Sequence, residues 1–153
     1  DSTYDTYAIA LADLVPATDN VRPWLRVGDS SGIDSGTNDY SNLQQEFRSN
    51  SADYRAIAHQ NIAYIFLPCQ YESVGNASGE GFGGLLHLHR PGDGTMRPML
   101  TGITAAFDTD TNLGGGIMLA QRNAVITLDR IQFLFNTGNI ASGRMTVWGI
   151  AHA

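Results

Sequence analysis

Hydrophobic and polar residues alternate with a period of two in several short segments of the chain. In Tyr7–Leu11 the odd positions are large and apolar, and alanines stand between them. In Val21–Val27 the odd positions are again apolar, whereas the even ones hold Arg22, Trp24 and Arg26. Successive side chains of a strand point to opposite faces, so the pattern predicts half-buried strands in both segments.

Similar segments, separated by turn sequences rich in Gly, Pro, Asn and Asp, continue to the end of the chain. The further expected strands are Asn61–Leu67, Leu85–Arg90, Pro98–Thr109, Asn123–Leu128, Asp129–Phe135 and Arg144–Ile150. Asn61–Leu67 is apolar throughout, which indicates a central strand buried on both faces. Leu43–His59 keeps no clean period and is expected to be strand and loop, while residues 28–42 are expected to form a loop and Asn112–Gly116 a turn.

About eight strands at intervals of roughly 8–12 residues predict an all-β protein, an antiparallel and jelly-roll-like β-sandwich without long helices. A length of 153 residues suits one domain, so residues 1–153 are expected to form a single β-sandwich. Hydrophobic residues make up 42% of the chain and charged residues only 16%, a composition that favours a packed core over disorder.

The charge distribution argues against two classes of partner. The formal net charge is −6, and the nine basic residues are all arginines that are scattered along the sequence. Binding to nucleic acid requires a basic stripe that displaces counterions, and an acidic protein is repelled by anionic lipid. No apolar run approaches the roughly 18 residues of a membrane span. We therefore expect neither nucleic-acid binding nor membrane insertion.

One short motif resembles a catalytic signature. Gly28–Gly32 fits the G-x-S-x-G pattern, in which Ser30 would be the nucleophile. That motif needs a helix directly after the serine, and the following Ile33–Thr37 segment is not helix-forming. Cys69, the only cysteine, has no evident histidine partner and is expected to be buried. The sequence thus predicts a protein without catalytic residues.

The sequence contains two possible metal sites, of which the first is a pair of histidines. His87 and His89 are two residues apart and so share one face of a strand, but the third ligand would have to come from elsewhere, such as His59, Asp93 or His152. A polar strand face that contacts a ligand or a neighbouring subunit explains the pair more simply. We expect no metal at this pair.

The second possible metal site is a loop. Asp108–Asn112 resembles the start of a calcium-binding loop, which requires glycine at its sixth position and glutamate at its twelfth. Leu113 and Leu119 stand at these positions. We therefore expect neither a bound metal nor a cofactor.

Trp24, flanked by arginines, is a candidate contact residue with two open interpretations. Its face of the strand either binds a sugar ring or a partner chain, or is covered within the protein. Trp148 shares parity with Thr146 and Ile150 and is expected in the core. The candidate ligand or partner contacts are therefore Arg22, Trp24, Arg26, His87 and His89.

Two stretches resemble segments of tailed-bacteriophage virion proteins. They are DSTYDTYAIALADLVPATDNVRPWLRVGD at residues 1–29 and ITLDRIQFLFNTGNIASGRMTVWGI at residues 126–150. The family pairs a "YDTY…VPATDNV…LR" opening with an "IRFLF-SGNIASG…LYGI" closing segment. The chain departs from this pattern at Pro23, within the opening strand, and at residues 145–148, where the family more often has "LY".

The resemblance implies a non-enzymatic structural protein of the virion, assembled as a homotrimer with other virion proteins. A tail-fibre or receptor-binding domain would contact a glycan or receptor on the host surface, whereas a capsid decoration protein would clamp the head. The resemblance also implies that the chain is the ordered part of a longer polypeptide. A free carbohydrate-binding module is a further alternative, suggested by Trp24 between Arg22 and Arg26.

Overall fold

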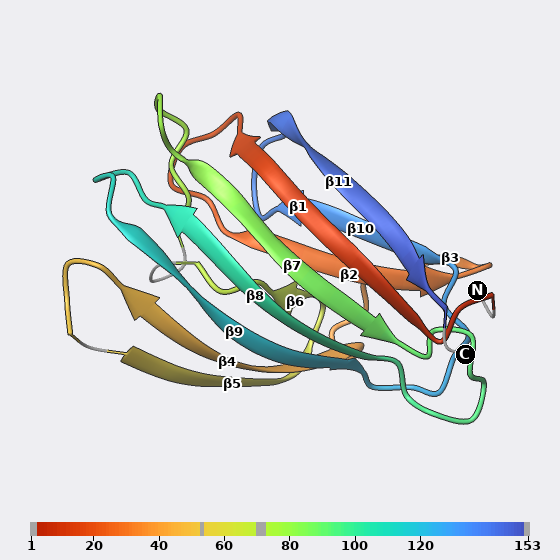
Figure 1. Ribbon diagram of the computed structural model, residues 1–153. Helices are drawn as coiled ribbons and strands as arrows, with labels where there is room; N and C mark the ends of the chain where they lie inside the picture. The colour runs from red at the N-terminus through yellow and green to blue at the C-terminus, as the bar shows by residue number, and fades with distance from the viewer. Residues whose placement is uncertain (1–2, 53, 70–72, 152–153) are drawn as a thin grey trace.

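The computed structural model describes residues 3–52, 54–69 and 73–151, which contain eleven strands and no helix (Figure 1). The strands form two antiparallel sheets. The large sheet has the order β11 (Ile140–Ile150), β1 (Thr6–Pro16), β7 (Gly81–His89), β8 (Met99–Phe107), β9 (Leu113–Arg122), β4 (Tyr40–Arg48) and β5 (Tyr54–Ile62). The small sheet has the order β10 (Arg130–Phe135), β2 (Pro23–Asp29) and β3 (Gly32–Ile33), and β6 (Ile65–Phe66) also pairs with β2.

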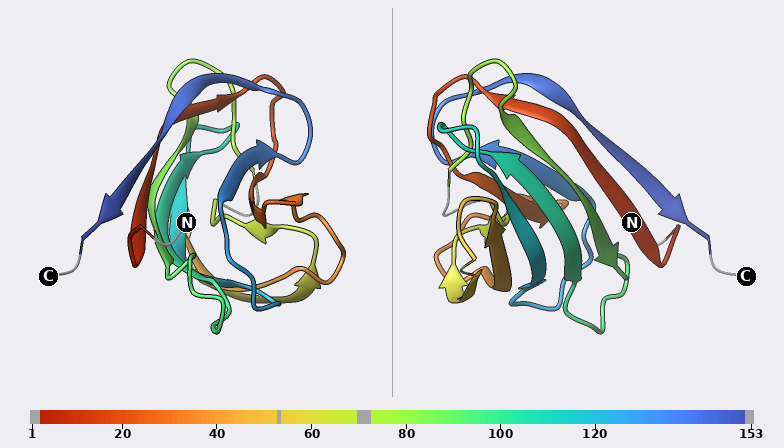
Figure 2. Two further views of the ribbon diagram at one scale, coloured as in Figure 1. Left: turned by 90° about the vertical axis from the view of Figure 1, so that its right-hand side faces the viewer. Right: turned by 60° about the vertical axis from the view of Figure 1, so that its left-hand side comes forward.

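The predicted all-β antiparallel sandwich is confirmed, with more strands than the eight expected because short strands extend the small sheet. The large sheet curves around the small one (Figure 2). The side chains between them form the core, which includes Ile9, Leu86, Leu100 and Met118 of the large sheet and Leu25, Val27 and Phe133 of the small one. Cys69 is buried, as predicted. In the described part of the chain no helix is long and apolar enough to cross a membrane.

Tyr40 joins the two sheets through its hydroxyl group. The ring is fully buried, and the single hydroxyl proton is within hydrogen-bonding reach of two acceptors, the backbone oxygens of Val27 and Asp34, each 2.9 Å from the hydroxyl oxygen. It also accepts a hydrogen bond from the Val27 backbone nitrogen at 3.0 Å. Burial raises the pKa of Tyr40 to about 12, so the neutral form that donates these bonds is retained.

Residues 112–116 do not form the predicted turn, because β9 begins at Leu113. A Cβ atom on Gly116 would overlap the carbonyl oxygen of Gln45 in β4. A Cβ atom on Gly115, whose φ is +152°, would overlap the carbonyl oxygen of Thr104 in β8. The glycines therefore allow β9 to lie close to both of its neighbours. Here a run of glycines indicates close packing of strands and not the predicted turn.

Two predicted strands, at residues 61–67 and 123–128, do not form as single strands. The segment Asn61–Leu67 is divided between two strands: β5 ends at Ile62, just after Asn61 with its left-handed φ of 56°, and beyond it only the two residues of β6 are strand. Residues 123–128 run between the sheets without a strand partner, because the backbone nitrogens of Asn123 and Leu128 donate to Asp39 and Pro91 instead. Apolar content did not distinguish these connecting segments from strands, although Ile65, Leu67 and Leu128 within them are buried.

The β4 strand is polar on the face that points into the sandwich. Asn42, Gln44 and Glu46 are buried there and form a ladder, with Asn42 Nδ2 donating to Gln44 Oε1 at 3.3 Å and Gln44 Nε2 to Glu46 Oε1 at 3.0 Å. Leu43 and Phe47 occupy the alternate positions and are about half exposed on the outer face. This strand reverses the usual arrangement of apolar-in and polar-out.

Replacing Tyr40 with phenylalanine should destabilise the fold. The change removes a hydroxyl that bridges the sheets and leaves buried polar backbone groups without that partner, at a cost of about 1–3 kcal/mol in the free energy of unfolding. Urea denaturation followed by circular dichroism measures the difference. Tyr54→Phe is the matched control, because Tyr54 is 66% exposed and its substitution should change stability by less than about 0.5 kcal/mol. Equal effects of the two substitutions would contradict the role given to Tyr40.

Candidate functional site

The outer face of the large sheet carries eleven large hydrophobic side chains that the small sheet does not cover. Each is between 38% and 66% exposed. They are Leu43, Phe47, Tyr54, Leu85, Met99, Ile103, Phe107, Leu113, Ile117, Leu119 and Trp148. We call this surface the apolar face; it is turned away from the small sheet in Figure 2. Antiparallel sheets with one solvated face normally carry polar residues on it, so the apolar face requires an explanation.

Strand register aligns these side chains in rows across the sheet. Leu85 pairs with Ile103, which pairs with Ile117, giving one continuous row over three strands. In the adjacent row Leu119 pairs with Leu43. Cross-strand neighbours of this kind lie about 4.5–5.5 Å apart at Cβ and contact one another. The apolar face is therefore contiguous, in contrast to the scattered exposed residues found on most surfaces.

Charge is almost absent from this face. Among the described residues, Arg144 on the edge strand β11 is the only charged side chain at an outward strand position. Asp13 lies beside the face, in a bulge of β1 where its φ is 52°. The chain as a whole has a net charge of −6, so its carboxylates are concentrated elsewhere.

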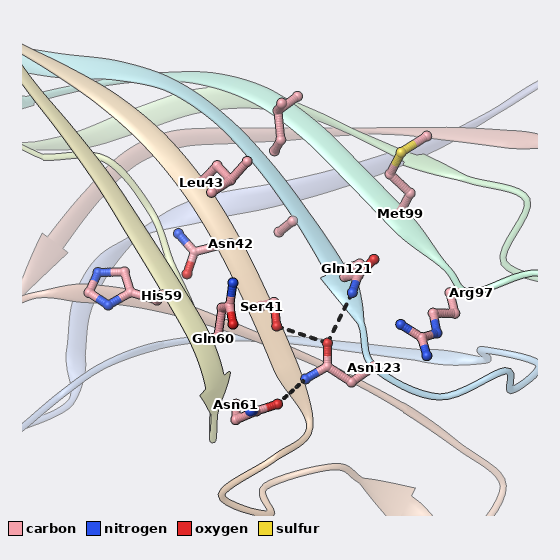
Figure 3. Close-up of a pocket in the computed structure, with 12 residues that line it drawn as sticks. Ser41, Asn42, Leu43, His59, Gln60, Asn61, Arg97, Met99, Gln121 and Asn123 are labelled. Carbon is pink, nitrogen blue, oxygen red and sulfur yellow. Dashed lines mark hydrogen bonds between the residues drawn. The ribbon is translucent and has the colours of Figure 1, made fainter.

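Two of the hollows in the apolar face are bordered by its large hydrophobic side chains. The larger, of about 610 Å³, lies near the ends of β4, β8 and β9, and its lining includes Leu119 and Met99. Figure 3 shows Met99 there with Arg97 and a group of polar amide side chains. Asn123 orders this polar end, since its Oδ1 accepts from Ser41 Oγ at 3.0 Å and from Gln121 Nε2 at 3.2 Å. Its side chain is held by internal hydrogen bonds, so the hollow has a fixed polar rim.

The smaller hollow, of about 390 Å³, lies between Ile103, Ile117 and Phe47. Its floor includes Ala105 and Gly115, which pair across β8 and β9 and provide little side-chain volume. Because Ile103 is 65% exposed at its border, a protruding apolar side chain stands next to an apolar depression. A surface with this relief can interlock with another apolar surface.

His87 and His89 belong to the apolar face, on β7. Their rings are 6.3 Å apart between centroids, and His89 Nε2 lies 3.0 Å from Thr101 Oγ1. Burial lowers the pKa of His89, and the neighbouring His87 adds to the effect. The described residues include no group of three His, Cys, Asp or Glu side chains that could hold a metal ion, and His152 lies outside them.

Arg22, Trp24 and Arg26 belong to the small sheet or directly precede it, so the structure does not bring them together with the histidines of the large sheet. The Trp24 indole is stacked on Tyr64 at 3.6 Å between ring centroids and is half-buried. Of the two interpretations of Trp24, the structure supports internal cover, supplied by Tyr64. Arg26 Nε donates to the carbonyl oxygen of Ala63 at 3.1 Å and so anchors the same segment.

Ser30 and the Asp108 loop have local structural roles. Ser30 lies in the turn between β2 and β3, no helix follows it, and the adjacent Ser31 donates its Oγ–H to Asp29 at 2.5 Å. The Asp108 Oδ1 atom accepts from the backbone nitrogens of Asp110 and Asn112 at 3.0 and 2.9 Å. The Asp-x-Asp-x-Asn pattern thus closes its own turn.

The prediction of a core position for Trp148 is wrong. Trp148 is 50% exposed on the outer side of β11, the edge strand of the large sheet. Sequence analysis also missed Ile103, Ile117 and Leu119 as a surface. The available signal was that β8 and β9 are apolar at positions of both parities, which an antiparallel strand with one solvated face is not.

Comparisons of the chain with protein-family models, with curated proteins and with solved structures gave no match.

Acidification should weaken the fold through His89. The pKa of His89 in the folded protein is below its ordinary value of 6.5. At a pH between these two pKa values, the unfolded chain therefore binds more protons than the folded protein does. The free energy of unfolding should therefore decrease as the pH falls through 6.5 and level off once His89 is also protonated in the folded protein. NMR titration of the imidazole resonances measures the pKa directly, and His89→Gln should reduce the pH dependence. A titration of His89 at or above 6.5 would contradict the prediction.

Proposed function

We propose that the protein is a non-enzymatic structural component of a bacteriophage virion, in the form of a tail-fibre or receptor-binding domain that contacts the host surface. The observation that carries the proposal is the contiguous apolar face of the large sheet. A protein that works alone in water rarely exposes an apolar patch larger than about 300–600 Å², whereas an assembly component exposes one until its partners cover it. The partners proposed are other virion proteins.

The remainder of the structure supports an architectural role. The inner strands are hydrogen-bonded on both sides within two open sheets, and the motif around Ser30 lacks the helix that a nucleophile elbow requires. A free carbohydrate-binding module would present an open aromatic ring to the sugar. Trp24 is instead stacked on Tyr64, which makes that alternative less favoured.

The two sides of the sandwich suit different tasks. The apolar face suits burial within the particle, because exposing it to water is unfavourable. The small sheet lies on the other side of the core, near Arg22, Trp24 and Arg26. We propose that this second side is directed toward the host glycan or receptor, with the two arginines supplying charge and hydrogen-bond donors.

Immunogold electron microscopy should locate the protein in the particle. Antibodies raised against the purified chain are applied to purified particles of the phage that encodes it. Labelling at the distal part of the tail is expected. Labelling over the capsid would replace the fibre assignment with that of a decoration protein. Particles that contain no label, and no band for this chain on a gel, would overturn the virion assignment.

A further inference from the structure

We propose that the apolar face is the interface between copies of this chain. The proposal deepens the proposed function, on which it rests for its setting in the particle, and it names the partner of the face as a second copy. Three observations support it: the size of the face, the distribution of charge, and the relief of the surface.

The size of the face matches one side of a stable protein interface. Eleven large side chains that are each about half exposed present on the order of 1,000 Å², taking about 200 Å² for one such side chain. A specific interface of standard size buries about 800 Å² on each partner, whereas the largest apolar patch of a typical monomer is about 300–600 Å². The face is thus large enough to support an association by itself.

The charge distribution favours a second copy over a partner of opposite charge. Two copies that each carry a net charge of −6 repel one another, and an interface between them must keep carboxylates apart. The outward strand positions of the apolar face carry Arg144 at the edge, and the carboxylate of Asp13 lies near them, at a hollow that this residue lines with Phe107 and Leu113 at the border of the face. A strongly acidic or basic partner would find only single charges at the borders of the face, those of Arg144, Arg97 and Asp13. The face suits a partner that is equally apolar.

The relief of the face is complementary to itself. Ile103, 65% exposed, protrudes beside the hollow of about 390 Å³ whose floor includes Ala105 and Gly115. In an interface between identical surfaces, the protrusion of one copy can enter the depression of the other, and the same contact then occurs twice. Such a two-fold contact joins the copies in pairs, in contrast to the homotrimer that the resemblance implies. The neutral amides around Asn123 at the end of the face would form a polar rim outside the apolar centre.

The reversed polarity of β4 also favours this assignment. Leu43 and Phe47 point outward although Asn42 and Gln44 are buried on the inner side of the same strand. Leaving apolar residues in water while burying polar ones is unfavourable for a monomer. Coverage of the outer side by a second copy removes the exposure of Leu43 and Phe47 to water, and the buried amides are already hydrogen-bonded to one another.

Light scattering across a dilution series tests the proposal. The wild-type chain should give a mass of at least twice 16.5 kDa, the mass of one copy. Ile103→Asp and Leu119→Asp each place a carboxylate at the centre of the face, where it would be buried and would meet the same charge on the partner. Each should raise the dissociation constant by about 100-fold or more, so that the monomer predominates.

Val125→Asp is the matched control. Val125 is 48% exposed, close to the 54% of Leu119, but lies in the segment between β9 and β10 and outside the apolar face. The same change of charge there should leave the oligomer intact. Circular dichroism establishes that the variants are folded. If an aspartate variant unfolds, Ile103→Thr and Leu119→Thr shorten the side chain while keeping a residue suited to strands, and should still weaken association.

A wild-type chain that remains a monomer at its highest soluble concentration would overturn the proposal and leave the face to a different partner. An oligomer that withstands Ile103→Asp and Leu119→Asp would also overturn it, because the interface would then lie elsewhere. These results are independent of the immunogold experiment. A stable oligomer that is absent from phage particles would support the interface and contradict the virion assignment. A monomer that immunogold labelling finds in the particles would support the virion assignment and contradict the interface.

Discussion

The small sheet can cover one face of the large sheet and not both. Seven strands curve around four, and the hydrophobic side chains between them complete a core that Tyr40 fastens by its hydrogen bonds to Val27. Burial of apolar surface stabilises by about 25 cal/mol per Å², and that gain is realised only on the inner side. The outer face keeps its apolar residues in water when the chain is alone. The unequal size of the sheets thus connects the fold with the proposed assembly.

The distribution of polar residues follows from the same constraint. The buried ladder of Asn42, Gln44 and Glu46 lies toward one side of the large sheet, beyond the centre of the core, and its side chains bond to one another. Buried polar groups are tolerated when they are hydrogen-bonded in this way. The ladder also determines which side of β4 faces the core. Without the ladder, the amides of Asn42 and Gln44 would face an apolar inner surface that offers them no hydrogen-bond partner.

The candidate surfaces lie on different sheets. His87 and His89 share the apolar face, where a lowered pKa keeps His89 neutral and compatible with burial. Arg22, Trp24 and Arg26 lie with the small sheet, where the stacking of Trp24 on Tyr64 holds the segment before β6 in place. The proposed function gives these sides separate tasks, assembly for one and contact with the host for the other. In a β-sandwich the inner faces of the two sheets meet in the core and their outer faces point in opposite directions. The two tasks can therefore be carried out on opposite sides of the protein.

The sequence by itself determined the all-β class, the two-residue periodicity of β1 and β2, and the lack of a helix after Ser30. These depend on local properties: alternation, turn residues and backbone preference. Only the tertiary structure decided that Trp148 faces outward and that residues 113–116 are strand. Alternation shows that a strand has two sides but not which side meets the other sheet. When both sides are apolar, as in β8 and β9, that choice depends on which strands become neighbours.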